Sequence, residues 1–198
     1  MVSRRGCLVA AAVVLSCTGS GGGGGLPSLA TNGPMAEKLT CEPYAAGGPW
    51  QQVMDRENRQ GSTEIWVPQG EKLPSARRRV RKNVAFNPGM TAVQAAQFSL
   101  IDGLTGCDKG LDPKLEGPDP GTEDGYDVAY GEATCSLAAI RHHLLVKAIR
   151  GAEAVYSVEV RFNADPSAEE VKVARDFLAK DVYLCPVARG VGRCANVR

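Results

Sequence analysis

The stretch LLVKAIRGAEAVYSVEVRF, residues 144–162, decides the fold class of this chain. Two apolar runs, 144–149 and 154–162, flank the turn sequence Arg150-Gly151-Ala152-Glu153. The second run alternates in character, as a strand does when its two faces have different surroundings. One of its faces carries four large apolar side chains: Tyr156, Val158, Val160 and Phe162. We therefore predict a β-hairpin over this stretch.

A helix is predicted directly after the hairpin, over residues 168–180. Ser167 and Glu170 have the spacing of a capping box, in which each side chain binds the backbone N–H of the other residue. Apolar residues then recur at helical spacing on one face: Val171, Ala174, Phe177 and Leu178. The sequence also predicts a last short strand at 182–185.

Upstream of the hairpin, residues 62–67 and 77–86 alternate as two more strands would. Thr91 and Gln94 repeat the capping-box spacing at the start of a predicted helix, residues 91–104. The buried stripe expected for this helix is Val93, Ala96, Leu100, Ile101 and Leu104.

Residues 108–127 are rich in glycine, proline and acidic residues, so we expect an exposed loop there. Its carboxylates lack the regular spacing around a central glycine that a calcium-binding EF-hand loop needs. The predicted order of elements is β-β-α-β-β-β-α-β, in which one strand before the hairpin is not assigned to particular residues. This order indicates an α+β fold, an antiparallel sheet with two helices in a layered sandwich.

The N-terminal residues have the pattern of an export signal. Arg4 and Arg5 precede the apolar run Cys7–Leu15. That run is much shorter than the ~20 residues of a membrane-spanning helix. Val14-Leu15-Ser16-Cys17 resembles the lipobox of bacterial lipoproteins, which implies cleavage before Cys17 and diacylation of its sulfur. The alternative is an ordinary signal peptide in which this cysteine has no role.

We therefore divide the chain into a signal peptide at 1–16, a lipidated cysteine with a flexible glycine-rich linker at 17–39, and a single folded domain at 40–198. In lipoproteins of Gram-negative bacteria, a residue other than Asp after the lipidated cysteine goes with delivery to the outer membrane. Here that residue is Thr18. The resemblance thus implies a protein anchored in the outer membrane and facing the periplasm.

The charge of the chain argues against nucleic-acid binding. Without Arg4 and Arg5, the mature chain carries 21 basic and 22 acidic side chains. A nucleic-acid-binding domain usually needs a clear excess of positive charge to attract the phosphate backbone. We expect the membrane, and an anionic component or protein of the envelope, as partners instead.

Five of the seven cysteines lie in the predicted domain. An exported chain meets an oxidising compartment, so we expect disulfide bonds. We favour the pairs Cys185–Cys194 and Cys107–Cys135. Cys41 would then be free, buried or bonded to another chain.

His142 and His143 are the only histidines. Adjacent residues point to different faces of a strand or helix, so these two cannot simply bind one metal ion together. No serine lies in a Gly-x-Ser-x-Gly motif, and no phosphate-binding glycine motif follows a strand. We expect no metal, no cofactor and no catalytic residue. The alternative is an envelope hydrolase or transferase that uses one of the histidines as a base.

The predicted strand at 77–86 carries a run of basic residues: Arg77, Arg78, Arg79, Arg81 and Lys82. Apolar residues at alternate positions place Arg79 and Arg81 together on the opposite side of this strand. That side is either a solvated sheet face or a surface that binds an anionic envelope component, such as lipid headgroups, or a protein partner. The function we expect is that of a membrane-anchored envelope lipoprotein acting as a non-enzymatic binding or accessory factor.

Three segments resemble known proteins: EIWVPQGEKL at 64–73, VKAIRGAEAVY at 146–156 and VYLCPVARGVGRC at 182–194. They are similar to a group of small exported bacterial lipoproteins of unassigned function. The first segment also resembles the opening of the PsbP/Mog1-like α/β/α sandwich. The shared positions are turn glycines, prolines, apolar strand residues and cysteines, so the resemblance implies a fold and no catalytic residue. Pro74-Ser75-Ala76 departs from the pattern, which has a Trp before the second strand.

Overall fold

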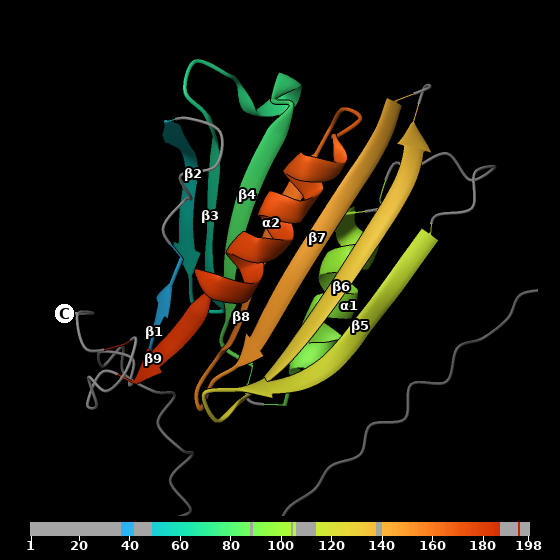
Figure 1. Cartoon of the computed structure of the whole chain (residues 1–198). Helices are drawn as coiled ribbons and strands as arrows, with labels where there is room; N and C mark the ends of the chain where they lie inside the picture. The colour runs from blue at the N-terminus through green and yellow to red at the C-terminus, as the bar shows by residue number, and fades with distance from the viewer. Residues whose placement is uncertain are drawn as a thin grey trace, which may run out of the picture. The chain divides into compact units, whose positions relative to one another are not determined.

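The computed structural model describes residues 37–41, 49–87, 89–103, 105, 114–137, 140–186 and 194. Within these residues, seven antiparallel strands form a main sheet in the order β2-β3-β4-β8-β7-β6-β5, and β1 pairs with β9 (Figure 1). The strands are β1 (Glu37–Thr40), β2 (Trp50–Asn58), β3 (Gly61–Pro68), β4 (Arg78–Ala85), β5 (Lys114–Glu123), β6 (Tyr126–Leu137), β7 (Ile140–Arg150), β8 (Val155–Phe162) and β9 (Tyr183–Pro186). The helices are α1 (Ala92–Gly103) and α2 (Ala168–Lys180), with a short 3-10 turn at Leu73–Ser75.

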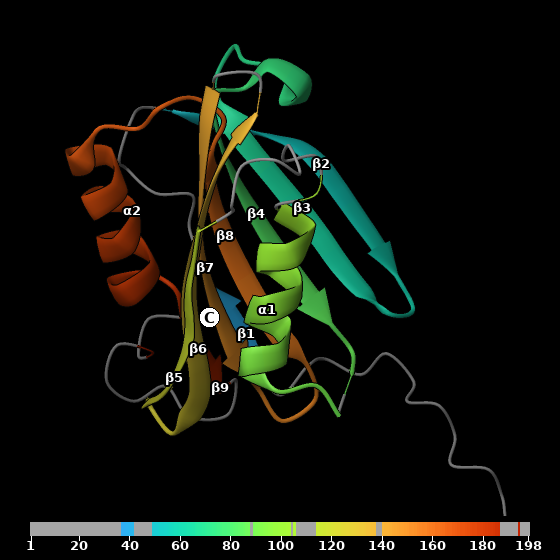
Figure 2. The ribbon, with the colours of Figure 1, turned by 90° about the vertical axis from the view of Figure 1, so that its right-hand side faces the viewer.

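The predicted hairpin is formed by β7 and β8, and β8 lies at the centre of the main sheet between β4 and β7. The two helices pack on opposite faces of this sheet (Figure 2). We call these faces the α1 face and the α2 face. The arrangement confirms the predicted α+β sandwich of an antiparallel sheet and two helices.

Each face of the main sheet has its own apolar core. On the α2 face, large side chains of β4, β7 and β8 pack against the helix, including Val80, Leu145, Val158, Phe162 and Phe177. On the α1 face the packed side chains are smaller, including Ala96, Ala129, Val146, Ala148 and Val155. The alternation of β8 therefore separates two buried faces and not a buried face from a solvated one.

α2 begins and packs as the sequence predicts. Ser167 Oγ accepts a hydrogen bond from the Glu170 N–H at 3.2 Å, and Glu170 Oε2 accepts one from the Ser167 N–H at 2.9 Å. The buried residues of the helix are those of the predicted stripe: Val171, Ala174, Phe177 and Leu178. The capping box and the apolar stripe of α2 are both confirmed.

α1 has the predicted start but a different buried face. Thr91 and Gln94 form the reciprocal cap, with hydrogen bonds of 2.9 and 3.1 Å. The buried residues are mostly small: Ala92, Ala95, Ala96, Ser99, Leu100 and Gly103. Ile101, which we expected in the core, is 54% exposed. Small residues face the sheet because the helix lies close to it: a Cβ on Gly103 would lie 2.1 Å from Leu144 Cδ2.

The segment predicted as an exposed loop contains a strand, β5. Among the described residues, this strand lies at one edge of the main sheet, where β6 is its pairing partner. The prolines and glycines of β5 favoured the prediction of a loop, because both residue types are depleted in strands. An edge strand tolerates them, since one side of its backbone needs no partner. Pairing shifts between Glu116 and Asp119, where Gly117 has a φ of 80°. The predicted order of elements contains six strands, whereas the described residues form nine.

β1 extends the folded part of the chain toward the N-terminus. Glu37 is 7% exposed, and its carboxylate accepts hydrogen bonds from the Ala152 N–H at 2.9 and 3.1 Å. Residues 37–39, predicted from sequence to be part of the linker, therefore belong to the folded unit. The predicted signal peptide, Cys17 and the rest of the linker lie outside the described residues.

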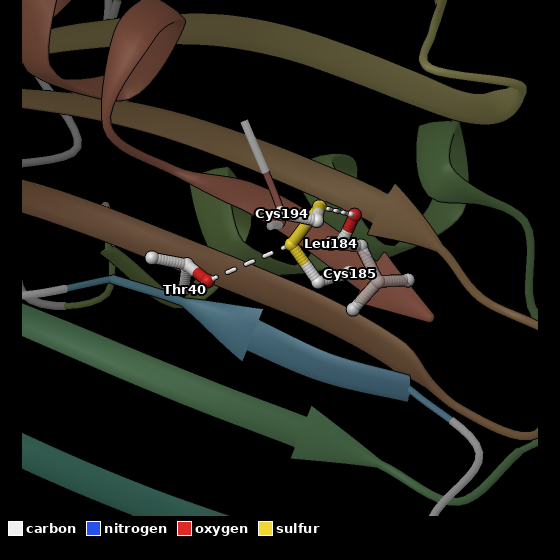
Figure 3. Close-up of a disulfide and its surroundings, with 4 residues drawn as sticks. All are labelled: Thr40, Leu184, Cys185 and Cys194. Carbon is white, nitrogen blue, oxygen red and sulfur yellow. Dashed lines mark hydrogen bonds between the residues drawn. A yellow bond between two sulfur atoms is a disulfide. The ribbon is translucent and has the colours of Figure 1, made fainter. Parts of the chain in front are cut away.

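The predicted Cys185–Cys194 disulfide is present and both of its cysteines are buried (Figure 3). Thr40 of β1 lies beside it, with Oγ1 4.0 Å from Cys185 Sγ. Cys135 of β6 is also disulfide-bonded. Its predicted partner, Cys107, lies outside the described residues.

Candidate anion-binding site

The pleat of β4 divides the predicted basic run between the two faces of the sheet. Arg78 and Lys82 lie on the α2 face with Val80, whereas Arg79 and Arg81 lie on the α1 face. Arg77 precedes the strand and is exposed. The five residues therefore do not form one surface.

The two basic residues of β4 on the α2 face are held by contacts within the fold. The guanidinium of Arg78 lies 5.8 Å from the centre of the Trp50 ring and 4.0 Å from Glu170 Oε1. Lys82 Nζ donates a hydrogen bond of 2.5 Å to Glu64 Oε1. These side chains connect β4 to β2, to β3 and to α2.

On the α1 face, Arg81 is fully engaged. Its Nε and Nη2 donate hydrogen bonds of 2.9 and 2.6 Å to the two carboxylate oxygens of Glu159, and its Nη1 donates one of 2.8 Å to Asp102 of α1. Glu159 is only 1% exposed. Burial lowers the pKa of Arg81, but the charges and hydrogen bonds of Glu159 and Asp102 outweigh burial and raise it. Arg81 therefore has the partners that a half-buried guanidinium needs.

Arg79 and Arg161 are in the opposite situation. They face each other directly across β4 and β8, where like charges destabilise a sheet. Among the described residues neither guanidinium has a hydrogen-bond or ion-pair partner, and Nε of Arg79 is buried without an acceptor. Burial lowers the pKa of Arg79, and the charges of Arg161 and Arg81 lower it further. We call Arg79, Arg81 and Arg161 the arginine cluster.

His142 lies at the edge of the arginine cluster. Its Nδ1 is 3.4 Å from Asn163 Oδ1. Burial lowers the pKa of His142, and the charges of Arg161 and Arg79 act in the same direction, against a hydrogen bond to Asn163 that raises it. These surroundings favour the neutral form of His142, so it contributes little positive charge to the cluster.

His143 lies on the other face of β7, as expected for adjacent residues of a strand. Its Nε2 is 3.1 Å from Glu132 Oε2, and its ring meets Phe162 edge-on at 6.4 Å. Glu132 also accepts hydrogen bonds from Arg175 of α2. The structure thus places the two histidines in different surroundings and does not bring them together.

Cys41 is the free cysteine of the described residues, and it packs against the core of the α2 face. Burial raises the pKa of its thiol to about 12, well above the ordinary value of 9.0. The reactive thiolate is therefore scarce at neutral pH.

A cavity of about 380 Å³ lies elsewhere, between the start of α1 and the β5–β6 hairpin. Its lining includes Thr91, Ala92, Thr122 and Asp127, and neither the arginine cluster nor a histidine takes part. Among the described residues, no three His, Cys, Asp or Glu side chains are grouped as a metal site would require. The helices in this part of the chain are too short or too polar to span a bilayer.

No protein-family model and no curated protein sequence matches this chain. Solved structures do match it. The cyanobacterial PsbP (CyanoP) of Synechocystis sp. PCC 6803 is 15% identical at a TM-score of 0.51, and the alignment covers 85% of this chain and 99% of CyanoP. This chain has a PsbP-like fold. LpqN of Mycobacterium tuberculosis, described as involved in cell envelope biogenesis, is 12% identical at a TM-score of 0.44, over 78% of this chain and 87% of LpqN.

The PsbP-like fold brings together residues that sequence reasoning did not connect. Glu159 and Arg161 are two positions apart and so lie on the same face of the predicted strand at 154–162. The sequence near them does not indicate that this strand pairs with β4. Asp102 lies on the predicted helix, and its position in the sequence does not indicate that it contacts Arg81. The sequence contains one indication of this pairing: the predicted strands that become β4 and β8 each carry a polar face of similar length and the same period.

Proposed function

We propose that this chain is an exported lipoprotein, anchored through a diacylated Cys17 on the periplasmic side of the outer membrane, that acts as a non-enzymatic binding or accessory factor. The leader and the lipobox-like sequence support the anchor. Nineteen residues, 18–36, separate Cys17 from β1. A flexible linker of that length has a reach of about 25 Å, which places the folded unit near the membrane surface.

The observation that carries the binding role is the arginine cluster. A buried donor without an acceptor costs about 1–3 kcal/mol, so a fold retains one more readily where a partner supplies the acceptor. Arg79 and Arg161 are half-buried guanidiniums without partners among the described residues. An anionic envelope component, such as a lipid headgroup or an acidic group of a protein, has the matching chemistry.

Intact mass spectrometry of the protein purified from membranes tests the anchor. We expect a chain that begins at Cys17 and carries a diacylglyceryl group. An unmodified chain that begins at another residue would exclude the lipoprotein assignment and with it the membrane location.

Binding to vesicles tests whether Arg77 and the arginine cluster on the α1 face contact an anionic membrane surface. The chain is expressed without its signal sequence and Cys17, so that it carries no acyl chains, which would insert into any bilayer. We expect this unlipidated protein to bind phosphatidylglycerol vesicles and not phosphatidylcholine vesicles, with weaker binding at high salt. Arg77→Glu with Arg79→Glu should reduce this binding about tenfold or more while the melting temperature changes by less than about 2 °C. Arg56→Glu with Arg59→Glu makes the same charge change at exposed positions of the β2–β3 hairpin and is the control. Equal losses in both variants would exclude a specific site on β4.

The second candidate is an envelope hydrolase or transferase, and the contact between His143 and Glu132 favours it. A carboxylate can orient an imidazole as a general base. Among the described residues, however, no serine, threonine or cysteine side chain is hydrogen-bonded to either histidine. Hydrolysis of p-nitrophenyl acetate that disappears in His143→Gln, with the fold intact, would support this candidate against the binding role.

A further inference from the structure

The arginine cluster has an uneven arrangement of charge that defines its ligand more closely. Arg81 is satisfied by Glu159 and Asp102, whereas Arg79 and Arg161 have no acceptor among the described residues. Three guanidiniums and two carboxylates leave the cluster with one net positive charge. The excess is on the directly opposed pair, Arg79 and Arg161.

One singly charged group would neutralise this excess. Arginine stays charged in proteins, so the pair cannot relieve its repulsion by losing a proton. A carboxylate or a phosphodiester carries one charge and two oxygens, and each oxygen can accept hydrogen bonds from a guanidinium. A doubly charged group would leave the neighbourhood of Glu159 with an excess of negative charge.

We propose that Arg79 and Arg161 together bind one singly charged oxyanion, a carboxylate or a phosphodiester, on the α1 face beside Arg81. This inference rests on the proposed function and names the ligand group that the envelope partner presents. Glu159 and Asp102 accept the hydrogen bonds of Arg81, and Asp102 connects the site to the last turn of α1.

The α2 face of the same strand provides the contrast. Arg78 and Lys82 have the same charge and alternate with Arg79 and Arg81 along β4. They are already engaged with Trp50, Glu170 and Glu64. Local sequence therefore does not distinguish the two sides of β4, and only the α1 side has guanidinium donors without protein acceptors in the described residues.

The test uses the protein purified from membranes in a neutral detergent, with ¹⁵N-labelled arginine. The Nε–Hε signal of Arg79 is followed by NMR during titration with dimethyl phosphate, with propionate, with sulfate and with chloride at constant ionic strength. We expect saturable shifts with dimethyl phosphate or propionate and a Kd on the order of 1 mM. Sulfate should bind no more tightly, and chloride should give no saturable shift. The tighter of the two organic probes identifies the source as a phosphodiester or a carboxylate.

Arg161→Met is expected to weaken binding of the preferred probe about tenfold, because one of the two guanidiniums is lost. Arg78→Met, on the α2 face, is the matched control and should leave the Kd within about twofold. If Arg161→Met does not fold, Arg161→Lys keeps the charge, removes the planar donor pair and should also weaken binding.

The absence of a saturable shift with either organic probe would overturn the inference, as would an equal loss of affinity in Arg78→Met. Vesicle binding that persists in the absence of probe binding would reject this site and leave the proposed function in place. Probe binding by a protein that carries no lipid and binds no vesicles would reject the proposed function and leave the site in place.

Discussion

At the scale of single residues, the fold buries charged side chains next to partners of opposite charge. Glu159 is 1% exposed beside Arg81. Lys147 is fully buried, and its Nζ donates hydrogen bonds of 2.7 Å to Glu123 Oε2 and to the Val182 carbonyl. A buried charge without such partners costs several kcal/mol. Arg79 and Arg161 are half-buried and have no such partner among the described residues, which is why they are the candidate site.

Glu132 links three elements on the α2 face through Arg175 of α2 and His143 of β7. Burial raises the pKa of this carboxyl group, but the hydrogen bonds and charges of Arg175 and His143 outweigh burial and lower the pKa from 4.5 to about 2. Because the folded pKa is the lower one, the ionised carboxylate stabilises the fold above about pH 4.5. This stabilisation is lost as the pH falls from there toward 2.

We predict that Glu132→Gln lowers the free energy of unfolding by about 1–2 kcal/mol at pH 7, since Arg175 is largely exposed and solvent screens part of the interaction. The difference from the wild type should become smaller at pH 3, where the wild-type carboxyl group begins to protonate. Urea unfolding of both proteins at pH 7 and pH 3 measures this difference in the free energy of unfolding. Glu57→Gln, at an exposed position of β2, is the control and should match the wild type. A loss of the same size at both pH values would contradict the assignment of the effect to ionisation.

At the scale of elements, local signals predict where the helices begin better than which side they bury. Both capping boxes are present, because a cap depends on residues three positions apart. The buried side of α1 depends on how closely the sheet approaches it. Gly103 and the alanines allow close packing, so Phe98 and Ile101 remain 60% and 54% exposed. β5 was missed for a similar reason, since its residues form a strand only because β6 offers an edge.

The cap of α2 provides a prediction at this scale. Ser167→Ala removes the acceptor for the Glu170 N–H and should lower the free energy of unfolding by about 1 kcal/mol. For a domain of this size, that loss lowers the melting temperature by about 2–4 °C. Ser167→Asp keeps an acceptor at the same position and should stay within a few tenths of a kcal/mol of the wild type. Equal melting temperatures for the two variants would show that the cap is not what Ser167 contributes.

At the scale of the whole molecule, β1 and β9 join the two ends of the described chain, and the Cys185–Cys194 disulfide lies beside them. Cross-linking a loop of this length stabilises a fold by about 2–3 kcal/mol, mainly by restricting the unfolded chain. Cys185→Ser with Cys194→Ser should therefore lower the free energy of unfolding by that amount. Amide hydrogen exchange should also become faster in β1 and β9 than in the central strand β8.

Cys41→Ala is the control for this variant because it removes a thiol and breaks no bridge. It should change stability by less than the double serine variant does. If hydrogen exchange in β1 and β9 is unchanged when the bridge is removed, the pairing of these strands does not depend on the disulfide.

The sequence by itself determined the α+β class, the β7–β8 hairpin, both helix starts and the Cys185–Cys194 bridge. These features depend on residues close together in the chain, where the periods of strands and helices are directly visible. Only the tertiary structure decided that β4 pairs with β8, which places Arg79 opposite Arg161 and Arg81 beside the buried Glu159. Residues so far apart in sequence meet only because burial of apolar side chains on both faces selects the strand order. The candidate site was therefore visible as a basic strand in the sequence, and its two unpaired arginines became visible only in the folded sheet.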